Sequence, residues 1–408
     1  MPERGAGAVT GLGLVTPAGI GVSTNWERIC SGEPTASTDP TLAGIMVDFS
    51  CRVPDFDAVT LLGRKHARRL DRFVQLAVVA AREAIADASL DPHGWDGGRV
   101  GVVVGCGMGG TATWETQHRR LLEQGPGKVS PLLIPMLIPN MVAGQLAMEF
   151  GATGPNFVTA TACASGATAI GVARDLLRAG ACDIVLTGGS EAGVTPLSIA
   201  GFAQMGALSK RRNDPARASR PFDVDRDGFV AAEAAGILVL ERPADARARG
   251  ARVRAHIVGY GASADGYHQT APDPEGNGAE RAIRAALTDA GVGAKDIQHV
   301  NAHGTSTPLN DVAEAQVLRR VLGDGAAVTS TKGVTGHALG AAGAIEAAYT
   351  VLAVEHGRIP PTANLDSQDP EVELDIVAKS AREQRVELAM SDSFGFGGQN
   401  AVLVVSAA

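Results

Sequence analysis

Aromatic residues are scarce in this chain of 408 residues, at 4%, although hydrophobic residues as a whole make up 45%. Small residues are abundant instead, including 51 glycines. Such a composition disfavours an aromatic β-sandwich and favours helices packed closely on sheets. The length exceeds that of one ordinary domain.

Long hydrophobic runs are absent as well. No segment reaches the roughly 18 uninterrupted apolar residues that suggest a membrane-spanning helix. The nearest candidate, residues 131–139 (PLLIPMLIP), is interrupted by three prolines. We therefore expect no membrane association.

Cysteines are few and isolated, with no C-x-x-C pair among them. They are Cys30, Cys51, Cys106, Cys163 and Cys182. Their spacing argues against a cysteine-based metal centre, and an odd number of separate thiols is typical of a reducing compartment. We predict a cytoplasmic protein with free thiols.

Positive charge is in deficit: 36 lysines and arginines face 44 aspartates and glutamates, for a net charge of −8. This disfavours nucleic acid as a partner, because nucleic-acid-binding surfaces are basic. Basic residues still cluster at residues 64–69 and 210–212. Such runs are often only solvated faces, so a docking role and a neutral one both stay open.

Short β-branched runs alternate with longer alanine-rich helical patterns, which predicts βα units around a buried, largely parallel sheet. The predicted strands are 7–15, 99–104, 156–159, 183–187, 235–241, 253–262, 297–301 and 401–406. The predicted helices are 72–88, 164–179, 279–290, 311–322 and 341–355. Their similar order in the two halves suggests a duplication with a seam near residues 235–255. Residues 209–227 are predicted to form a long surface loop.

The strongest chemical motif is T-A-C-A-S-G, which places Cys163 between an apolar strand and an alanine-rich helix. Unpaired N–H groups and the dipole at a helix N-terminus favour a thiolate there. The small neighbours let a substrate carbonyl approach the sulfur. The other cysteines lack this context and are expected to be buried and unreactive. Cys163 is therefore the candidate nucleophile.

Two histidines lie in similar turns at predicted strand ends. His303 belongs to N-A-H-G-T-S-T-P-L-N-D, and His337 belongs to T-K-G-V-T-G-H-A-L-G-A-A-G, with Lys332 five residues upstream. A lone histidine is more often structural than catalytic. Two histidines in such turns point to a chemical role, because functional groups collect in loops at strand ends.

Two glycine-rich turns need separate interpretation. The first, F-G-F-G-G with Phe394 and Phe396, leaves backbone N–H groups uncovered, as an oxyanion site requires, although both phenylalanines could equally be core residues. The second, with Gly105, Gly107 and Gly110, fits G-x-G-x-x-G after a strand. No apolar helix follows it, so we predict no nucleotide binding.

With these motifs in this order, the chain resembles the β-ketoacyl-(acyl carrier protein) synthase I/II family of condensing enzymes, most closely synthase II. The likeness runs from V-T-G-L-G-L-V-T-P-A-G to G-F-G-G-Q-N. It implies an α/β thiolase fold, with duplicated βα halves in five α-β-α-β-α layers. The halves would be residues 1–245, with the nucleophilic cysteine, and residues 246–408, with the histidines and lysine. Members are normally homodimers.

The resemblance implies a decarboxylating Claisen condensation that yields β-ketoacyl-ACP. Cys163 would hold the acyl chain as a thioester, with its own N–H and that of Phe396 stabilising the oxyanion. His303 and His337 would stabilise the enolate that forms when malonyl-ACP loses CO₂. Two donors aimed at one oxygen perform this task.

Supporting roles also follow from the resemblance. Lys332 would pair with Glu346 and tune the electrostatics of the histidine loop. Thr305 and Thr307 match the hydroxyls that bind the phosphopantetheine arm of the acyl carrier protein, which enters as part of the substrate.

A gate, a tunnel and a docking surface complete the implied machinery. Phe394 and Phe396 match the gating loop, while Met108 and Phe202 match residues that line the acyl tunnel. The basic residues that match the carrier-protein docking surface are Lys65, Arg68 and Arg69.

Two departures from the family pattern bear on the site. Asp392 stands where asparagine is common; in relatives, the positions of Asn301, Glu346, Ser391 and Asp392 can surround a monovalent cation. No other metal and no bound cofactor are expected. Met108 replaces a branched aliphatic residue, which could alter the preferred chain length.

The pathway stays open between two readings. The first is elongation in fatty acid synthesis; the alternative is a ketosynthase of a type II polyketide or other specialised acyl pathway, which would form a heterodimer with a chain-length partner. A non-catalytic chain-length subunit is disfavoured because Cys163 is present. A degradative thiolase is disfavoured because no second cysteine lies in a matching motif.

Overall fold

A computed structural model describes residues 5–408; the first four residues of the predicted N-terminal half lie outside this part. Its strands are β1 (Gly7–Thr16), β2 (Gly19–Ile20), β3 (Ser37–Thr38), β4 (Phe49–Ser50), β5 (Val100–Gly105), β6 (Asn156–Thr159), β7 (Ile184–Glu191), β8 (Ala234–Glu241), β9 (Ala255–Ala264), β10 (His299–Asn301), β11 (Ala327–Thr329), β12 (Arg358–Ile359), β13 (Asp375–Ile376), β14 (Arg382–Glu383), β15 (Leu388–Gly395) and β16 (Gln399–Ala407).

The helices alternate with these strands. They are α1 (Val22–Ser31), α2 (Ala58–Arg69), α3 (Arg72–Asp87), α4 (Thr111–Gln124), α5 (Leu133–Leu137), α6 (Met141–Phe150), α7 (Ser165–Arg178), α8 (Pro196–Gln204), α9 (Pro243–Ala248), α10 (Asn277–Ala290), α11 (Pro308–Leu322), α12 (Lys332–Thr335) and α13 (Ala342–His356). Two short 3₁₀ turns matter for the site: η4 (Ala162–Ala164) and η7 (Leu339–Ala341).

One mixed sheet crosses the described part of the molecule, in the order β13-β11-β10-β15-β16-β9-β1-β8-β7-β5-β6. The first-half strands read β6-β5-β7-β8-β1, and the second half repeats this order as β11-β10-β15-β16-β9. In each set, the first three strands are parallel neighbours and the last two pair antiparallel. An antiparallel contact between β1 and β9 joins the sets. The halves thus share one topology, although the sequence shows no clear residue-level repeat.

The prediction of a largely parallel sheet was wrong for the strands near the centre. β15 was missed by the sequence analysis, and it returns to β16 through a turn of three residues, 396–398. So short a connection requires antiparallel pairing, whereas parallel neighbours need a long crossover. β7 and β8 are buried almost throughout, so their hydrophobic runs carry no signal of strand direction.

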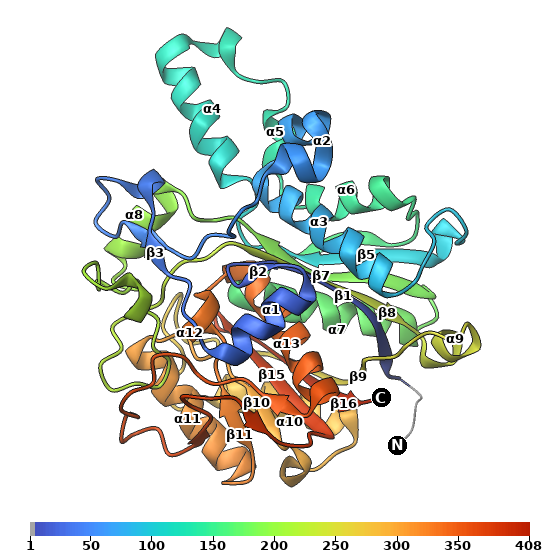
Figure 1. Ribbon diagram of the computed structural model, residues 1–408, viewed down its shortest axis with the longest axis vertical. Helices are drawn as coiled ribbons and strands as arrows, with labels where there is room; N and C mark the ends of the chain where they lie inside the picture. The colour runs from blue at the N-terminus through green and yellow to red at the C-terminus, as the bar shows by residue number, and fades with distance from the viewer. Residues whose placement is uncertain (1–4) are drawn as a thin grey trace.

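The elements stack in five layers, as the resemblance implied (Figure 1). α3 and α6 cover the outer face of the first-half strands, and α10 and α11 cover the outer face of the second-half strands. α7 and α13 lie between the two sets and pack against each other. α13 is buried from Ala342 to Val354 on all sides, which suits a central helix of small and aliphatic residues. Among the described helices, none is long and apolar enough to cross a membrane.

The predicted surface loop at residues 209–227 is exposed over most of residues 210–217, as predicted, but residues 218–223 are buried. Phe222 is fully enclosed, and Arg220 forms an ion pair with Asp223 at 2.8 Å. Arg226 pairs with Asp369 at 2.6 Å. The charged composition suggested exposure throughout, but these two arginines pair with carboxylates and so allow the later part of the loop to be buried.

Candidate active site

The candidate nucleophile lies in a sharp turn before a central helix. Cys163 is the middle residue of η4, which leads directly into α7. The preceding Ala162 has a φ of 48°, a left-handed conformation that non-glycine residues rarely adopt and that often marks functional turns. The thiol lines a cavity of about 630 Å³.

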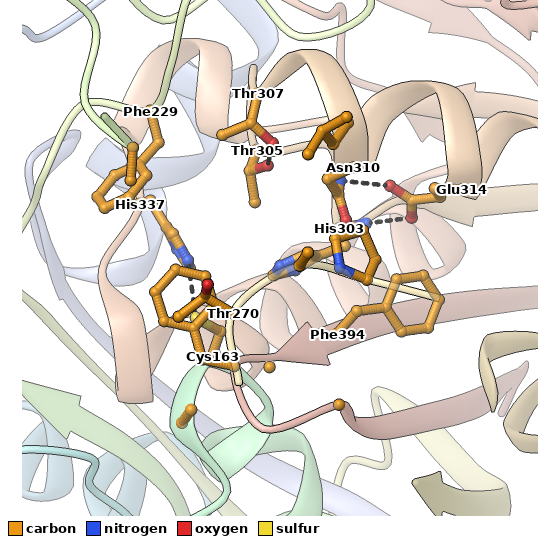
Figure 2. A pocket seen from close by; sticks show the side chains of 18 of the residues that line it. Cys163, Phe229, Thr270, His303, Thr305, Thr307, Asn310, Glu314, His337 and Phe394 are labelled. Carbon is orange, nitrogen blue, oxygen red and sulfur yellow. Dashed lines mark hydrogen bonds between the residues drawn. The ribbon is translucent and has the colours of Figure 1, made fainter. Parts of the chain in front are cut away.

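Both candidate histidines line the same cavity (Figure 2). Nε2 of His337 lies 3.1 Å from Sγ of Cys163, and the ring centroids of His303 and His337 are 5.4 Å apart. One possible ligand atom from each of the three residues lies within 4.8 Å of the others. The nucleophile comes from the first half of the chain and both imidazoles from turns of the second half, so the two halves build one site.

The same three groups could geometrically surround a soft metal ion, but their surroundings do not suit one. A histidine that binds a metal normally donates its second ring nitrogen to a carbonyl or carboxylate. The Nδ1 atoms of His303 and His337 are buried and have no such partner among the described residues. The arrangement therefore suits a nucleophile with two imidazoles better than a metal centre.

Burial governs the protonation of all three groups. It lowers the pKa of His303 and of His337 well below the usual range, and the nearby Lys332 cation lowers both further. Both imidazoles are thus neutral and able to donate an N–H. Burial also raises the pKa of the Cys163 thiol to about 11, although Lys332 and the Phe396 N–H oppose this. Burial thus favours a thiol at rest, opposite to the effect expected of the helix start, and His337 lies in position to take its proton.

Lys332 connects the histidine turns to α13. It begins α12, is buried, and forms an ion pair with Glu346. Its Nζ also donates a hydrogen bond to the carbonyl of His303 at 2.5 Å. Burial raises the pKa of Glu346 to about 7, and the Lys332 charge opposes that rise. The lysine thus fixes the His303 turn and supplies the positive charge felt by both imidazoles.

Glu314 is a site residue that the sequence analysis missed. Its carboxylate, on α11, accepts N–H groups from His303 and Gly304, each at 2.7 Å (Figure 2). It lies eleven residues after His303 on the buried face of its helix. Two carboxylates, Asp311 and Glu314, on the mostly apolar face of this helix were the available signal, since such groups are buried only with partners.

The glycine-rich turn between β15 and β16 lies against the nucleophile. The Phe396 N–H is close enough to the Cys163 sulfur to stabilise negative charge on it. The Phe394 ring meets the His303 ring edge-on, with centroids 5.8 Å apart. Phe394 therefore packs on a catalytic candidate rather than serving only as a core residue.

The predicted substrate-binding residues line different parts of the cavity. The hydroxyls of Thr305 and Thr307 lie 2.9 Å apart on the His303 side (Figure 2). Met108 and Phe202 lie in other parts of the wall, and Phe202 packs edge-on against Phe229. The cavity thus has a polar stretch and an apolar stretch, as a polar arm with an acyl end would require.

The basic docking candidates lie outside the cavity, on α2. Lys65, Arg68 and Arg69 are exposed there. Most other arginines of the described chain are engaged in ion pairs, for example Arg72 with Glu233 and Arg82 with Glu149. The three side chains on α2 instead expose their positive charge to solvent.

Buried oxygen atoms without partners gather behind the histidine turns. β10 and β15 place Asn301 directly beside Ser391. Among the described residues, Asn301 Oδ1, Ser391 Oγ, Glu346 Oε2 and both carboxylate oxygens of Asp392 lack a hydrogen-bond partner. Burial, with the nearby charges of Glu314 and Glu346, raises the pKa of Asp392 well above its usual range. An all-oxygen set of this kind fits a hard cation.

Family models match both halves of the chain. A model described as β-ketoacyl synthase, N-terminal domain, matches residues 8–246, and one described as β-ketoacyl synthase, C-terminal domain, matches residues 254–366. The chain belongs to the β-ketoacyl synthase family. This agrees with the resemblance seen in the motifs around Cys163, His303 and His337.

Curated relatives match over nearly the whole length. The 3-oxoacyl-[acyl-carrier-protein] synthase 2 of Synechocystis sp. is 47% identical over 408 residues, covering 98% of each chain. That of Staphylococcus aureus is 46% identical over 405 residues, covering 97% of this chain and 99% of the relative.

Solved structures share the thiolase-like ketosynthase fold. The ishigamide ketosynthase/chain length factor matches with a TM-score of 0.93 at 35% identity, covering 99% of this chain and 100% of that one. A β-ketoacyl synthase from Burkholderia phymatum STM815 matches with a TM-score of 0.93 at 34% identity, covering 98% and 99%. A type II PKS ketosynthase complex with its acyl carrier protein matches with a TM-score of 0.92 at 33% identity, covering 99% of each chain.

Proposed function

We propose that this chain condenses malonyl-ACP with an acyl chain carried on Cys163, with loss of CO₂, to give β-ketoacyl-ACP in fatty acid elongation. The observation that carries the proposal is the 3.1 Å approach of His337 to the Cys163 sulfur, with His303 on the same cavity. The relatives named synthase 2, at 46–47% identity, support the same reaction and pathway.

The first half-reaction transfers the acyl group to the enzyme. His337 Nε2 takes the thiol proton as the Cys163 sulfur attacks the acyl thioester. The N–H groups of Cys163 and Phe396 stabilise the oxyanion, and its collapse expels the pantetheine thiolate. His337 returns the proton to that thiolate, so the enzyme keeps the acyl thioester and both imidazoles are neutral again.

The second half-reaction forms the carbon–carbon bond. The His337 proton first moves from Nδ1 to Nε2 by exchange with solvent. The malonyl carboxylate then leaves as CO₂, and its electron pair passes into an enolate whose oxygen accepts N–H groups from His303 and His337. The enolate carbon attacks the thioester carbonyl on Cys163, and collapse of that intermediate releases the cysteine thiolate. One proton from solvent restores the thiol. Neutral imidazoles suit this role because they can donate to a developing anion.

The carrier protein is proposed to dock on α2. Carrier-protein recognition is supported by the unpaired positive charge of Lys65, Arg68 and Arg69 and by the printed names of the relatives. Thr305 and Thr307 would receive the phosphopantetheine arm. No resident cofactor is part of the proposal, and a cytoplasmic location follows from the unpaired cysteines.

A homodimer is proposed from the edge of the sheet. β6 is the last strand of its set, and Asn156 and Phe157 on it are exposed. Exposed apolar residues also gather on the neighbouring helices, including Trp114, Ile134 and Met148. A sheet edge such as β6, surrounded by exposed apolar side chains, is typical of an interface between chains.

The division into halves at residues 245 and 246 also belongs to the proposal, and the repeated strand order supports it. A monovalent cation is proposed behind the histidine turns. Asn301, Glu346, Ser391 and Asp392 would hold it, and its charge would stabilise the buried carboxylates. None of the steps above depends on it.

A polyketide or other specialised acyl pathway is the alternative. It is favoured by structural neighbours that are ketosynthases with a chain length factor or in a type II PKS complex. A requirement for a different partner chain would distinguish it from fatty acid elongation.

The deciding experiment incubates the purified protein with malonyl-ACP and a panel of saturated acyl-ACPs, and identifies products by mass spectrometry. We expect β-ketoacyl-ACP two carbons longer than each accepted primer, without a second protein chain. Condensation only in the presence of a chain-length partner would support the alternative, and no condensation under either condition would refute both.

A further inference from the structure

A carboxylate with no role in the proposed mechanism lies in the wall of the same cavity. Glu191 is the last residue of β7, is fully buried, and lines the cavity together with Cys163. The direct partners of its carboxylate are backbone N–H groups and the thiol of Cys106. A buried carboxylate is costly unless such partners hold it.

The backbone donors belong to the glycine turn that follows β5. The N–H of Gly107 donates to Oε2 at 2.7 Å, that of Met108 to both oxygens at 3.2 Å, and that of Gly109 to Oε1 at 3.3 Å. Gly107 is the middle glycine of the G-x-G-x-x-G pattern noted in the sequence. The turn does bind an anion, but the anion is a side chain of the same protein.

The fit around the carboxylate is close. A Cβ added at Gly107 would lie 3.0 Å from Oε2, and one added at Gly340 would lie 2.6 Å from it. Burial raises the pKa of Glu191 to about 7, and the backbone N–H groups oppose the rise. The turn and the carboxylate therefore determine each other's position.

The middle residue of that turn is Met108, which lines the cavity. Its sulfur lies against Gly193, where an added Cβ would come within 3.1 Å. Leu339, also in the cavity wall, would lie 3.2 Å from the same Cβ. Met108 is thus confined on its far side by packing and on its backbone side by the three N–H groups that donate to Glu191.

We propose that Glu191 is a positioning residue for acyl-chain selectivity: by holding the turn at residues 107–109, it fixes Met108 in the wall that a long acyl chain must pass. This inference rests on the proposed function, because it concerns the acylation of Cys163. A short acyl group ends near the sulfur and makes little use of that wall. Loosening the turn therefore affects long chains far more than short ones.

The test measures acylation of Cys163 by intact-protein mass spectrometry, with acetyl-, octanoyl- and dodecanoyl-ACP. Glu191→Gln keeps the shape of the side chain but replaces one carboxylate oxygen with an amide NH₂ group. That group faces backbone N–H donors and cannot accept hydrogen bonds from them. We expect kcat/KM for dodecanoyl transfer to fall about tenfold, and that for acetyl transfer by less than about twofold. Decarboxylation of malonyl-ACP should stay at the wild-type rate. Glu371→Gln, at an exposed glutamate, is the matched control and should leave the whole profile unchanged.

Gly107→Ala tests the same contact from the other side and serves if the glutamate variant does not fold. Its methyl group presses on the carboxylate, while the backbone conformation of Gly107 is not a left-handed one. Gly107→Ala should give the same roughly tenfold fall in kcat/KM for dodecanoyl transfer. An equal loss for all chain lengths, or an unchanged profile, would overturn the inference. If the wild-type protein itself acquired no acyl group, the proposed function would fail, and this inference with it.

Discussion

Nε2 of His337 lies 3.1 Å from Sγ of Cys163, and the two groups are neutral at rest because both are buried. A neutral thiol must lose its proton as it attacks, and His337 is the group placed to receive it. In the proposed mechanism, the pair therefore works as nucleophile and base rather than as a preformed thiolate.

Replacing the sulfur separates the two half-reactions. Cys163→Ala should abolish condensation, because no acyl thioester can form. Cys163→Gln should still decarboxylate malonyl-ACP, since the histidines remain, but should yield acetyl-ACP and no longer product. Release of CO₂ and the mass of the carrier-bound product measure both outcomes. Any chain extension by Cys163→Ala would contradict the role given to this residue.

Removing one imidazole tests the enolate site. His303→Ala and His337→Ala should each slow decarboxylation about a hundred- to a thousandfold, the usual effect of losing one oxyanion donor. His303→Ala should keep much of its acylation rate, because this residue is not bonded to the sulfur. Single-turnover acylation and CO₂ release separate the effects. Condensation at the wild-type rate by either variant would show that the roles are wrongly assigned.

Lys332 should set the acid limit of activity. Its charge and burial keep both histidine pKa values low, so the wild-type decarboxylation rate should not fall as pH drops through about 6.5, the ordinary histidine pKa. In Lys332→Met the cation is lost, the histidine pKa values rise, and the acid-side loss should move to higher pH. The double variant Lys332→Met/Glu346→Gln also removes the buried carboxylate that has lost its cation, and it serves as the stability control. An identical pH profile in wild type and Lys332→Met would contradict this account.

Charge on α2 should govern encounter with the carrier protein. Reversal of Lys65, Arg68 and Arg69 to glutamate should raise KM for acyl-ACP about tenfold and weaken the dependence of rate on salt. The rate with a small acyl-pantetheine thioester should not change, since the cavity is separate from α2. Lys295→Glu, at an exposed lysine elsewhere, is the matched control. An equal loss with the small substrate would indicate a folding defect instead of lost docking.

The contact between the central helices should tolerate no added methyl group. A Cβ at Gly166 of α7 would lie 2.6 Å from the Ala344 nitrogen, and one at Gly343 of α13 would lie 2.9 Å from the Ala167 nitrogen. Gly166→Ala and Gly343→Ala should each lower the free energy of unfolding by about 1–3 kcal/mol. Urea titration measures this, with Gly127→Ala, where nothing lies near the added Cβ, as the control. Unchanged stability in both helix variants would contradict the close packing.

Much of the site could be predicted because its motifs are local. In the turn before α7 and in the two histidine turns, small residues directly follow an apolar run, which is a sequence signal for a strand end. The structure brings Cys163, His303 and His337 to one cavity. The five helices predicted from the sequence lie close to α3, α7, α10, α11 and α13, whereas the other described helices were not predicted.

What could not be predicted depends on contacts between distant segments. The carboxylate of Glu191 accepts backbone N–H groups from a turn 82–84 residues earlier, and that of Glu314 accepts backbone N–H groups ten and eleven residues earlier. A backbone group leaves no mark on the sequence. Complete burial is the largest influence on the pKa of Cys163, and it arises from packing between distant segments. The buried position of Phe222 depends on arginine–carboxylate pairs that composition alone presents as solvent-facing charge.

The repeated topology contains two equivalent turns that differ in their middle residue. η4 and η7 each precede a central helix, and their first residues, Ala162 and Leu339, share the same φ of 48°. The middle residue is a reactive cysteine in one turn and Gly340 in the other. Beside Gly340 the space for a second thiol is taken by the Glu191 carboxylate. A cysteine introduced there would meet an anion instead of a substrate, so the two turns share a backbone conformation, but only the Cys163 turn has room for a thiol that faces the cavity.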